Sequence, residues 1–286
     1  MSKFVPKAGK VNKDLVKKFV KQLDYHDRLL VITGAGISTE SGIPDYRSEG
    51  VGLYARSNHR PTNHNTFMKS AEVRQRYWAR NFLAWPNFSK AKCNTNHYAL
   101  ADWERSDRFC WLITQNVDGL HLKAGSEMVT ELHGSGHHVR CMNCEFQEHR
   151  NDLQTRMHEK NPDFMRKYTN PGELAPDGDV MIEPGAEKEF SVCNCPQCDG
   201  ILKTDVVFFG DFVPRDVVDF CHEKVDECDA VLVIGSSLSV MSSYRFVHQA
   251  NLQEKPIYIL NIGPTRADKL ATMKLDYKIS DVISSI

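Results

Sequence analysis

Four short apolar runs constrain the fold more than any other feature of this 286-residue sequence. They cover residues 29–33, 109–114, 230–235 and 257–261. Short runs rich in Val, Ile and Leu are typical of parallel strands that are buried on both faces. Helix-like stretches lie between them, at residues 71–82, 96–105 and 216–227. The alternation predicts an α/β fold with a Rossmann-like, doubly wound parallel sheet.

Each apolar run is followed directly by a polar or glycine-containing turn. The turns comprise Gly34, Ala35 and Gly36; Gln115, Asn116, Val117 and Asp118; Gly235, Ser236 and Ser237; and Asn261, Ile262 and Gly263. In sheets of this kind, ligands bind beyond the carboxyl ends of the strands. We therefore expect all four turns to meet at one crevice.

Composition excludes several classes of protein. The hydrophobic content of 41% and the charged content of 26% are ordinary for a globular domain, and the net charge is −1. That charge gives no overall field to attract nucleic acid or an anionic membrane. The apolar runs are too short to span a bilayer. At the N-terminus, Leu15, Phe19 and Leu23 follow Asn12 at helical spacing and predict an amphipathic helix with a solvated lysine face.

Two C-x-x-C pairs predict a metal site. Cys141 and Cys144 form one pair, and Cys195 and Cys198 form the other. Four thiolates on two tight turns suit a tetrahedral Zn²⁺ and leave no open position, so the zinc would be structural. Four unrelated reduced cysteines are the alternative, and Cys193 could compete as a ligand. We expect an inserted module at residues 139–202, with a long loop at 161–179. It would lie between the two parts of the Rossmann-like domain, at residues 1–138 and 203–286.

The first glycine turn departs from a dehydrogenase fingerprint. A third glycine would be expected at position 39, but Thr39 stands there, next to Ser38. An acidic residue about 20 positions further on is also missing, because that region reads "GLYARSN". A phosphate cradle of bare N–H groups and hydroxyls remains possible. Hydride transfer is therefore disfavoured.

His133 lies between Gly134 and the turn that ends in Asp118. A lone histidine is as often a surface or satisfied core residue as a functional one. A neighbouring glycine lets a ligand approach closely, and the ordinary pKa of histidine suits a general base near neutral pH. Both interpretations stay open on these residues alone.

The ordered set "GAGIS…GIPDYRS", "TQNVD", "LHG", two C-x-x-C pairs, "VVFFGD", "IGSSL" and "LNIGPTR" resembles the sirtuins, the NAD-dependent protein-lysine deacylases. The resemblance covers nearly the whole chain. The variable segments "GLYARS", "RYWARNF" and "LAPDGDV" look most like the mitochondrial class II members. A location in the mitochondrial matrix is implied by this resemblance only.

The resemblance implies a role for each motif. Gly34, Ala35, Gly36 and Ser38 would hold the phosphates of NAD, and Asp45, Tyr46 and Arg47 would close over its ribose and nicotinamide. Tyr46 stands where the family usually has phenylalanine. Asn116, Val117 and Asp118 would grip the carboxamide, with Asn116 and Asp118 assisting catalysis, and Gln115 would touch the ribose. His133 would be the general base. Gly235, Ser236, Ser237, Asn261, Ile262, Gly263 and Ile279 would bind the adenosine side.

The same resemblance implies how the acylated peptide binds. The peptide would add as a strand between residues 206–211, including Val207, Phe208, Phe209 and Gly210, and residues 238–240, including Leu238. Tyr54 and Arg56 loosely resemble a Tyr-x-x-Arg motif that recognises acidic acyl chains, and Arg60 lies just beyond. Glutaryl-type or other longer acyl groups are therefore expected to be removed faster than acetyl. A solvated surface role for Arg56 is the alternative.

Two other functions stay open. A mono-ADP-ribosyltransferase on the same fold would transfer ADP-ribose to a protein nucleophile. A non-enzymatic zinc-ribbon module would bind nucleic acid or protein, but basic residues do not cluster near the C-x-x-C pairs. The partners expected are acyl-lysine proteins, with no nucleic acid, no membrane and a monomeric state.

Overall fold

The computed structural model describes residues 3–58, 60–169, 172 and 174–285. Its larger unit is a six-stranded parallel sheet with the order β3-β2-β1-β7-β8-β9. The strands are β1 (Leu29–Thr33), β2 (Trp111–Thr114), β3 (Val129–Glu131), β7 (Ala230–Ile234), β8 (Ile257–Leu260) and β9 (Met273–Leu275). The predicted Rossmann-like sheet is confirmed.

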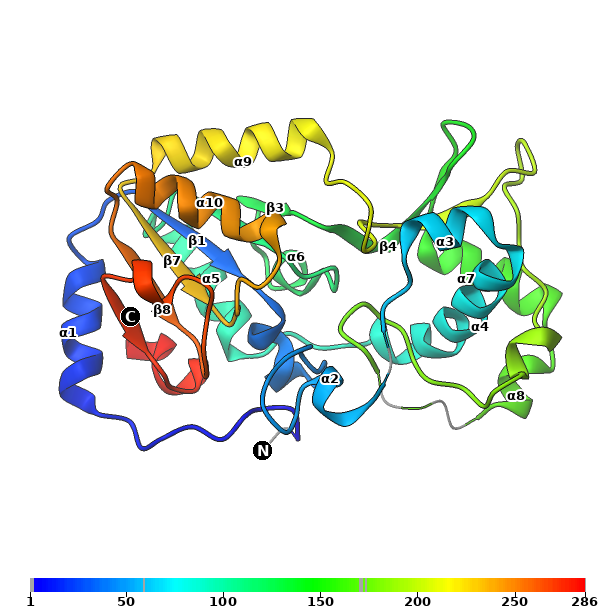
Figure 1. Ribbon diagram of the computed structural model, residues 1–286, viewed down its shortest axis with the longest axis horizontal. Helices are drawn as coiled ribbons and strands as arrows, with labels where there is room; N and C mark the ends of the chain where they lie inside the picture. The colour runs from blue at the N-terminus through cyan, green and yellow to red at the C-terminus, as the bar shows by residue number, and fades with distance from the viewer. Residues whose placement is uncertain (1–2, 59, 170–171, 173, 286) are drawn as a thin grey trace.

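Helices cover both faces of this sheet because alternate residues of each buried strand point to opposite sides. Leu29 and Val31 pack with α1 (Lys13–Leu23) and α5 (Thr95–Arg105), whereas Leu30 and Ile32 pack with α9 (Arg215–Glu227) and α10 (Met241–Leu252). Figure 1 shows α9 and α10 along one side of the sheet and α1 on the other. The N-cap at Asn12 and the helix that follows it are confirmed. Its buried face differs from the prediction, because Val16 packs inward with Phe19 and Leu23 while Leu15 is exposed.

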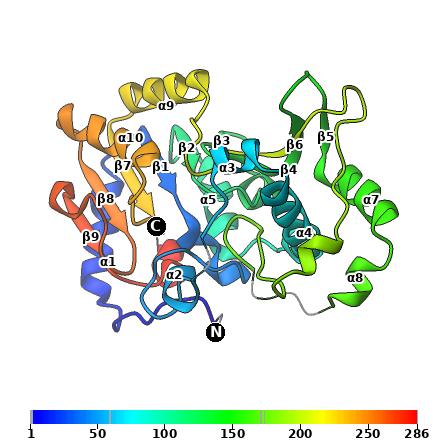
Figure 2. The ribbon, with the colours of Figure 1, turned by 45° about the vertical axis from the view of Figure 1, so that its right-hand side comes forward.

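The smaller unit contains a three-stranded antiparallel sheet in the order β5-β4-β6. Its elements are α3 (His64–Lys69), α4 (Ala71–Phe88), β4 (Gly134–Cys141), β5 (Gln147–His149), α7 (Arg150–Lys160), α8 (Phe164–Lys167) and β6 (Leu202–Val206). Figure 2 shows α4, α7 and α8 gathered beside this sheet. The loop expected at 161–179 contains α8, and its residues 170, 171 and 173 lie outside the described part of the chain.

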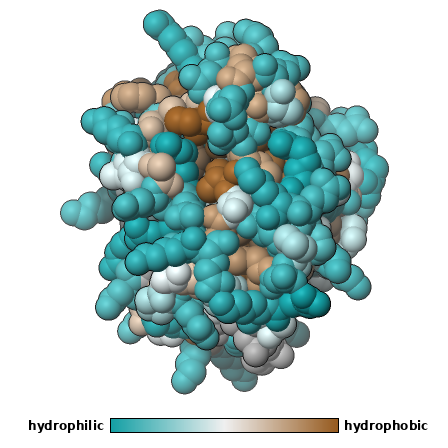
Figure 3. All heavy atoms as spheres, turned by 90° about the vertical axis from the view of Figure 1, so that its right-hand side faces the viewer, coloured by the Kyte–Doolittle hydropathy of each residue, from teal (hydrophilic) through white to brown (hydrophobic). Residues whose placement is uncertain are grey.

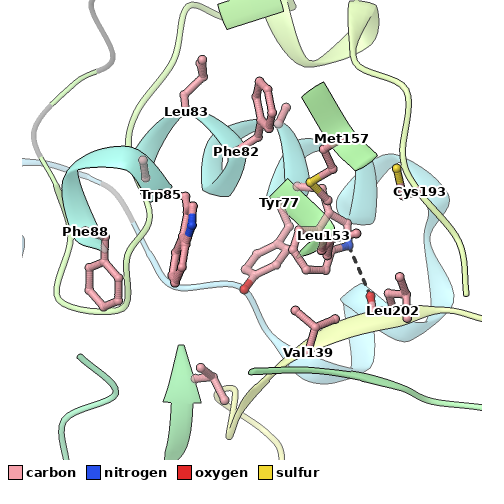
Figure 4. Packing of buried hydrophobic residues seen from close by; sticks show 14 of the residues in the cluster. Tyr77, Phe82, Leu83, Trp85, Phe88, Val139, Leu153, Met157, Cys193 and Leu202 are labelled. Atoms are coloured by element: carbon pink, nitrogen blue, oxygen red, sulfur yellow. Dashed lines mark hydrogen bonds between the residues drawn. The ribbon is translucent and has the colours of Figure 1, made fainter. Parts of the chain in front are cut away.

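Helix α4 shares one hydrophobic core with the predicted insertion. Tyr77, Phe82 and Trp85 pack with Leu153 and Leu202 (Figure 4). The indole N–H of Trp78 donates to the carbonyl of Leu202 at 3.2 Å. We therefore propose that the smaller unit combines residues 64–88 with residues 134–206, so that it extends a few residues beyond the predicted insertion at 139–202 to include all of β4 and β6. Hydrophilic side chains cover most of its outer end (Figure 3).

The remaining elements are short. They are the helices α2 (Leu53–Arg56) and α6 (Leu120–Lys123), and the 3₁₀ helices η1 (Ala35–Ser41), η2 (Ala186–Glu189), η3 (Asp268–Leu270), η4 (Ile279–Asp281) and η5 (Ile283–Ser285). Helix η1 begins directly after β1 and ends at Gly42, whose φ is 86°. No described helix is both long and apolar enough to cross a membrane.

Candidate active site

A cavity of about 1400 Å³ lies where the sheet meets the smaller unit. All four predicted turns contribute to its wall. Of the candidate residues, it is lined by Ala35, Gly36, Asp45, Tyr46, Arg47, Gln115, Asn116, Val117, His133, Val207, Phe208, Phe209, Gly210, Gly235, Ser236, Ser237, Asn261, Ile262, Gly263 and Ile279. Six candidate residues do not line the cavity. Four of them lie behind its wall: Gly34, Ser38, Asp118 and Leu238. The other two are Tyr54 and Arg56.

The glycine turns after β1 and β7 touch each other. The amide of Gly36 donates to the carbonyl of Gly235 at 2.9 Å. A Cβ on Gly36 would lie 2.7 Å from that oxygen, and one on Gly235 would lie 2.6 Å from the amide nitrogen of Ile37. The sequence therefore needs glycine at both positions to bring the two strand ends together. Bare backbone at this edge suits a bound phosphate group.

The ring of His133 is held in one tautomer. Its Nδ1 lies 3.0 Å from the carbonyl oxygen of Gln115. A carbonyl only accepts hydrogen bonds, so Nδ1 carries the proton and Nε2 keeps its lone pair. Burial lowers the pKa of His133, and the bond to Gln115 opposes this shift. His133 is therefore neutral near pH 7 and is able to accept a proton at Nε2.

A buried polar network lies behind the turn that follows β2. The hydroxyl of Ser38 donates to Oδ2 of Asp118 at 2.7 Å and accepts from the side-chain amide of Asn116 at 3.1 Å. Nε2 of His97 lies 3.4 Å from the Ser38 hydroxyl. The backbone N–H of Asn94 donates to Nδ1 of His97. Burial raises the pKa of Asp118 and lowers the pKa of His97 to about 4. The network fixes the orientation of Asn116 at the cavity wall.

The loop between η1 and α2 covers one side of the cavity. The carboxylate of Asp45 accepts from the amides of Arg47 and Ser48 at 3.1 and 2.8 Å, which folds the loop into a tight turn. The ring of Tyr46 lies against that of Tyr54, with centroids 5.6 Å apart. The guanidinium of Arg47 lies over Tyr54 at 5.5 Å. These contacts place Tyr46 and Arg47 at the cavity.

The two arginines proposed for acyl recognition point elsewhere in this structure. Nε of Arg56 donates to the carbonyl of Val51 at 2.7 Å, and its guanidinium lies 4.9 Å from the ring centre of Phe4. The guanidinium of Arg60 lies 4.8 Å from the ring centre of Tyr54. Neither side chain lines the cavity as the structure stands.

The sequence patterns did not identify several residues at the cavity. Ser242, in the first turn of α10, lies with Oγ 2.8 Å from Nε2 of His133. Lys3, Pro6, Pro176 and Asp177 also line the wall. A serine at the start of the helix after the Gly235 turn was the only available signal for Ser242. Pro176 and Asp177 lie in the segment LAPDGDV, but its resemblance to class II members did not assign them to the site. Lys3 and Pro6 carry no motif that distinguishes them from ordinary loops.

The four predicted zinc ligands come together in the smaller unit. The sulfurs of Cys141, Cys144, Cys195 and Cys198 all lie within 4.8 Å of one another. The Sγ atoms of Cys141 and Cys198 are 3.5 Å apart, and those of Cys144 and Cys195 are 3.7 Å apart. Thiolates bound tetrahedrally at 2.3 Å from Zn²⁺ would be separated by roughly 3.8 Å. The cluster therefore fits a structural zinc ion, and Cys193 is not part of it.

Comparisons with known proteins agree with this geometry. The Sir2 family model matches residues 34–242. The NAD-dependent protein deacylase sir-2.2 of Caenorhabditis elegans is 59% identical and is covered over 99% of both chains. The NAD-dependent protein lipoamidase sirtuin-4, mitochondrial, of Bos taurus is 52% identical over 99% of this chain and 89% of its own length. A solved complex of Sir2 with a p53 peptide and NAD⁺ has a TM-score of 0.71 at 26% identity, covering 94% of this chain and 96% of that one.

Proposed function

The chain belongs to the Sir2 family, and on that basis we propose that it is an NAD-dependent protein-lysine deacylase. The relatives named as NAD-dependent deacylases match it from end to end. The products would be the free lysine, nicotinamide and O-acyl-ADP-ribose. The mitochondrial names of the sirtuin-4 relatives support a location in the mitochondrial matrix.

The observation that carries this proposal is the state of His133. Nδ1–H is committed to Gln115, and the Nε2 lone pair lies at the wall of the cavity. A neutral imidazole in this position is suited to take a proton from a substrate hydroxyl. His133 is therefore assigned the role of general base.

The turns around the cavity have the donors that NAD needs. The bare backbone of Gly36 and Gly235 would face the phosphates, and the side chain of Asn261 would face the adenosine ribose. Asn116, oriented by Ser38, would hold the nicotinamide carboxamide, and Gln115 would contact the nearby ribose. When bound, NAD supplies the ribose carbon that accepts the acyl oxygen as nicotinamide leaves.

An acylated peptide fits the open side of the cavity. The backbone of residues 207–210 and of residues 238–240 would pair with an added strand, and the acyl-lysine would enter beside Val117 and Phe208. We propose that acyl groups longer than acetyl are preferred, including glutaryl-type chains. The lipoamidase name of two relatives supports a long acyl group.

The zinc ion would stabilise the fold of the smaller unit. Four thiolates complete its coordination, so it would add no open position for chemistry. We propose that the protein acts as a monomer on protein substrates, with no nucleic acid or membrane as partner.

The decisive experiment incubates the purified protein with NAD and a panel of acyl-lysine peptides. Mass spectrometry should detect O-acyl-ADP-ribose in amounts equal to the nicotinamide released. Transfer of label from radioactive NAD to protein, without deacylated peptide, would instead support a mono-ADP-ribosyltransferase. A protein whose Tm is unaffected by NAD would refute both enzymatic functions.

A further inference from the structure

Ser242 contacts the atom of His133 that the proposed reaction uses. Its Oγ lies 2.8 Å from Nε2, and Ser242 itself lines the cavity. Because Nδ1–H is bonded to the carbonyl of Gln115, Nε2 has only a lone pair to offer. The hydroxyl of Ser242 must therefore be the donor in this hydrogen bond. The lone pair of His133 Nε2 therefore already accepts a hydrogen bond from Ser242 before any substrate binds.

The contact belongs to a closed ring of hydrogen bonds. The hydroxyl of Ser243, the next residue of α10, donates to Oε1 of Gln115 at 2.9 Å. The side-chain nitrogen of Gln115 donates in turn to Oγ of Ser236 at 2.7 Å. Gln115 thus orients His133 through its carbonyl and fixes the start of α10 through its side chain. Gln115 therefore holds both partners of the Ser242–His133 hydrogen bond in place.

We propose that Ser242 is a positioning residue for His133, whose hydroxyl holds Nε2 at the cavity wall until a substrate hydroxyl takes its place. This inference rests on the proposed function, because it takes His133 as the base. When Nε2 accepts the substrate proton, it becomes an N–H donor. The Ser242 hydroxyl then rotates and accepts from it, so Ser242 neither gains nor loses a proton overall.

The hydroxyl donates to the neutral ring and accepts from the charged ring, and the hydrogen bond to the charged ring is the stronger of the two. Loss of the Ser242 hydroxyl should therefore lower the affinity of His133 for protons. The charged side chains that share the cavity are Lys3, Lys7, Glu40, Asp45, Arg47, Glu49, Asp177, Asp211, Arg245 and Lys278. No ion pair joins His133 to any of them within the described residues. Removal of the Ser242 hydroxyl should therefore be the main cause of any change in the pKa of His133.

The test compares Ser242→Val with Ser242→Thr, which have the same shape but differ in the hydroxyl. NMR titration of the histidine rings is run on the zinc-loaded full chain without NAD or peptide, and His133→Tyr identifies the signal of His133. Ser242→Val should lower the pKa of His133 by roughly half to one unit, because the charged ring loses the stronger hydrogen bond. Ser242→Thr should return it toward the wild-type value. The acid limb of kcat/KM should move to lower pH by a similar amount in Ser242→Val alone.

Equal pKa values of His133 in the two variants, or no fall of that pKa in Ser242→Val, would overturn the inference. That result is distinct from failure of the proposed function, which would appear as no O-acyl-ADP-ribose from the wild-type protein. The NMR titration also stands alone, because it needs no turnover.

Discussion

The amide of Gly36 donates to the carbonyl of Gly235 across the point where the order of the strands changes direction. This bond joins the ends of β1 and β7, two neighbours in the sheet that are separated by most of the chain. It also sets the spacing of the backbone that would hold the phosphates of NAD. The closeness of the two turns leaves no space for a side chain at either position.

Gly235→Ala should abolish NAD binding. The residue has φ of 61°, and the new Cβ would lie 2.6 Å from the nitrogen of Ile37. The matched control is Gly185→Ala, because Gly185 has φ of 91° with nothing within 4 Å of its Cβ position. The control should lose about 1–2 kcal/mol of stability from the left-handed backbone alone. NAD should raise the Tm of the control but not that of Gly235→Ala; a normal NAD response in Gly235→Ala would contradict the assignment.

His133→Tyr should lower deacylation by about 10²–10⁴-fold, the usual contribution of a general base. The rise in Tm caused by NAD should persist, because the proposed role of His133 is to act on a hydroxyl rather than to anchor the cofactor. His138→Tyr is the control, since His138 is exposed on β4, the strand that begins directly after His133. Turnover near the wild-type level in His133→Tyr would remove it from the mechanism.

Metal analysis of the purified protein should find one Zn²⁺ per chain. Cys195→Ser should lose it and destabilise the smaller unit, because the free energy of metal binding contributes to folding. Cys193→Ser should keep it, since Cys193 lies outside the four-sulfur group although it is buried nearby. Loss of zinc in Cys193→Ser but not in Cys195→Ser would show that the ligand set is wrong.

Acid should destabilise the protein through its buried histidines, and His97 offers the clearest test. Its pKa is about 4 in the folded state, below the usual value near 6.5, because burial disfavours the charged ring. Protons therefore bind the unfolded chain first, and stability falls as pH drops from 6.5 toward 4. At pH 5 this costs about 2 kcal/mol.

His97→Gln should make the pH dependence shallower by that amount, measured by urea unfolding between pH 7.5 and 5. Glutamine at this position of α5 is also suited to the capping box that His97 forms with Asn94. Parallel curves for wild type and His97→Gln would mean that His97 does not titrate as described.

The sequence predicts best where local and tertiary preferences agree. Strand β1 coincides with the expected run at residues 29–33 because all five residues are buried. Helix α4 runs past the predicted end at residue 82 and continues through Pro86. Pro86 leaves the carbonyl of Phe82 without its helical donor, and the side chain of Gln154 donates to it at 3.0 Å. That donor comes from a distant helix, so no local pattern could reveal it.

The residues of the site also divide into those that a local sequence pattern predicts and those that depend on contacts distant in the chain. The turns that line the cavity were predictable because each directly follows a buried strand. Strand β4 was not predicted, since its sequence GSGHHVRC lacks apolar alternation and it pairs with β6, which lies far away in the chain. Ser242 was missed for a similar reason, because its contact with His133 spans 109 positions.

The last prediction concerns the acyl group. If Arg56 recognises a terminal carboxylate, it must leave the carbonyl of Val51 and the ring of Phe4 to reach the cavity. Arg56→Met should then narrow the preference for glutaryl- over acetyl-lysine by about ten- to a hundredfold, the value of a charge-assisted pair. Phe4→Ala should widen the preference, because one contact that draws Arg56 away from the cavity is removed. Arg60→Met tests the second candidate arginine, which lies over Tyr54. Arg215→Met is the control, because Arg215 is exposed on α9 and does not line the cavity. Both peptides should be assayed for kcat/KM with each variant, and an unchanged ratio in both Arg56→Met and Phe4→Ala would exclude Arg56 as the residue that reads the acyl chain.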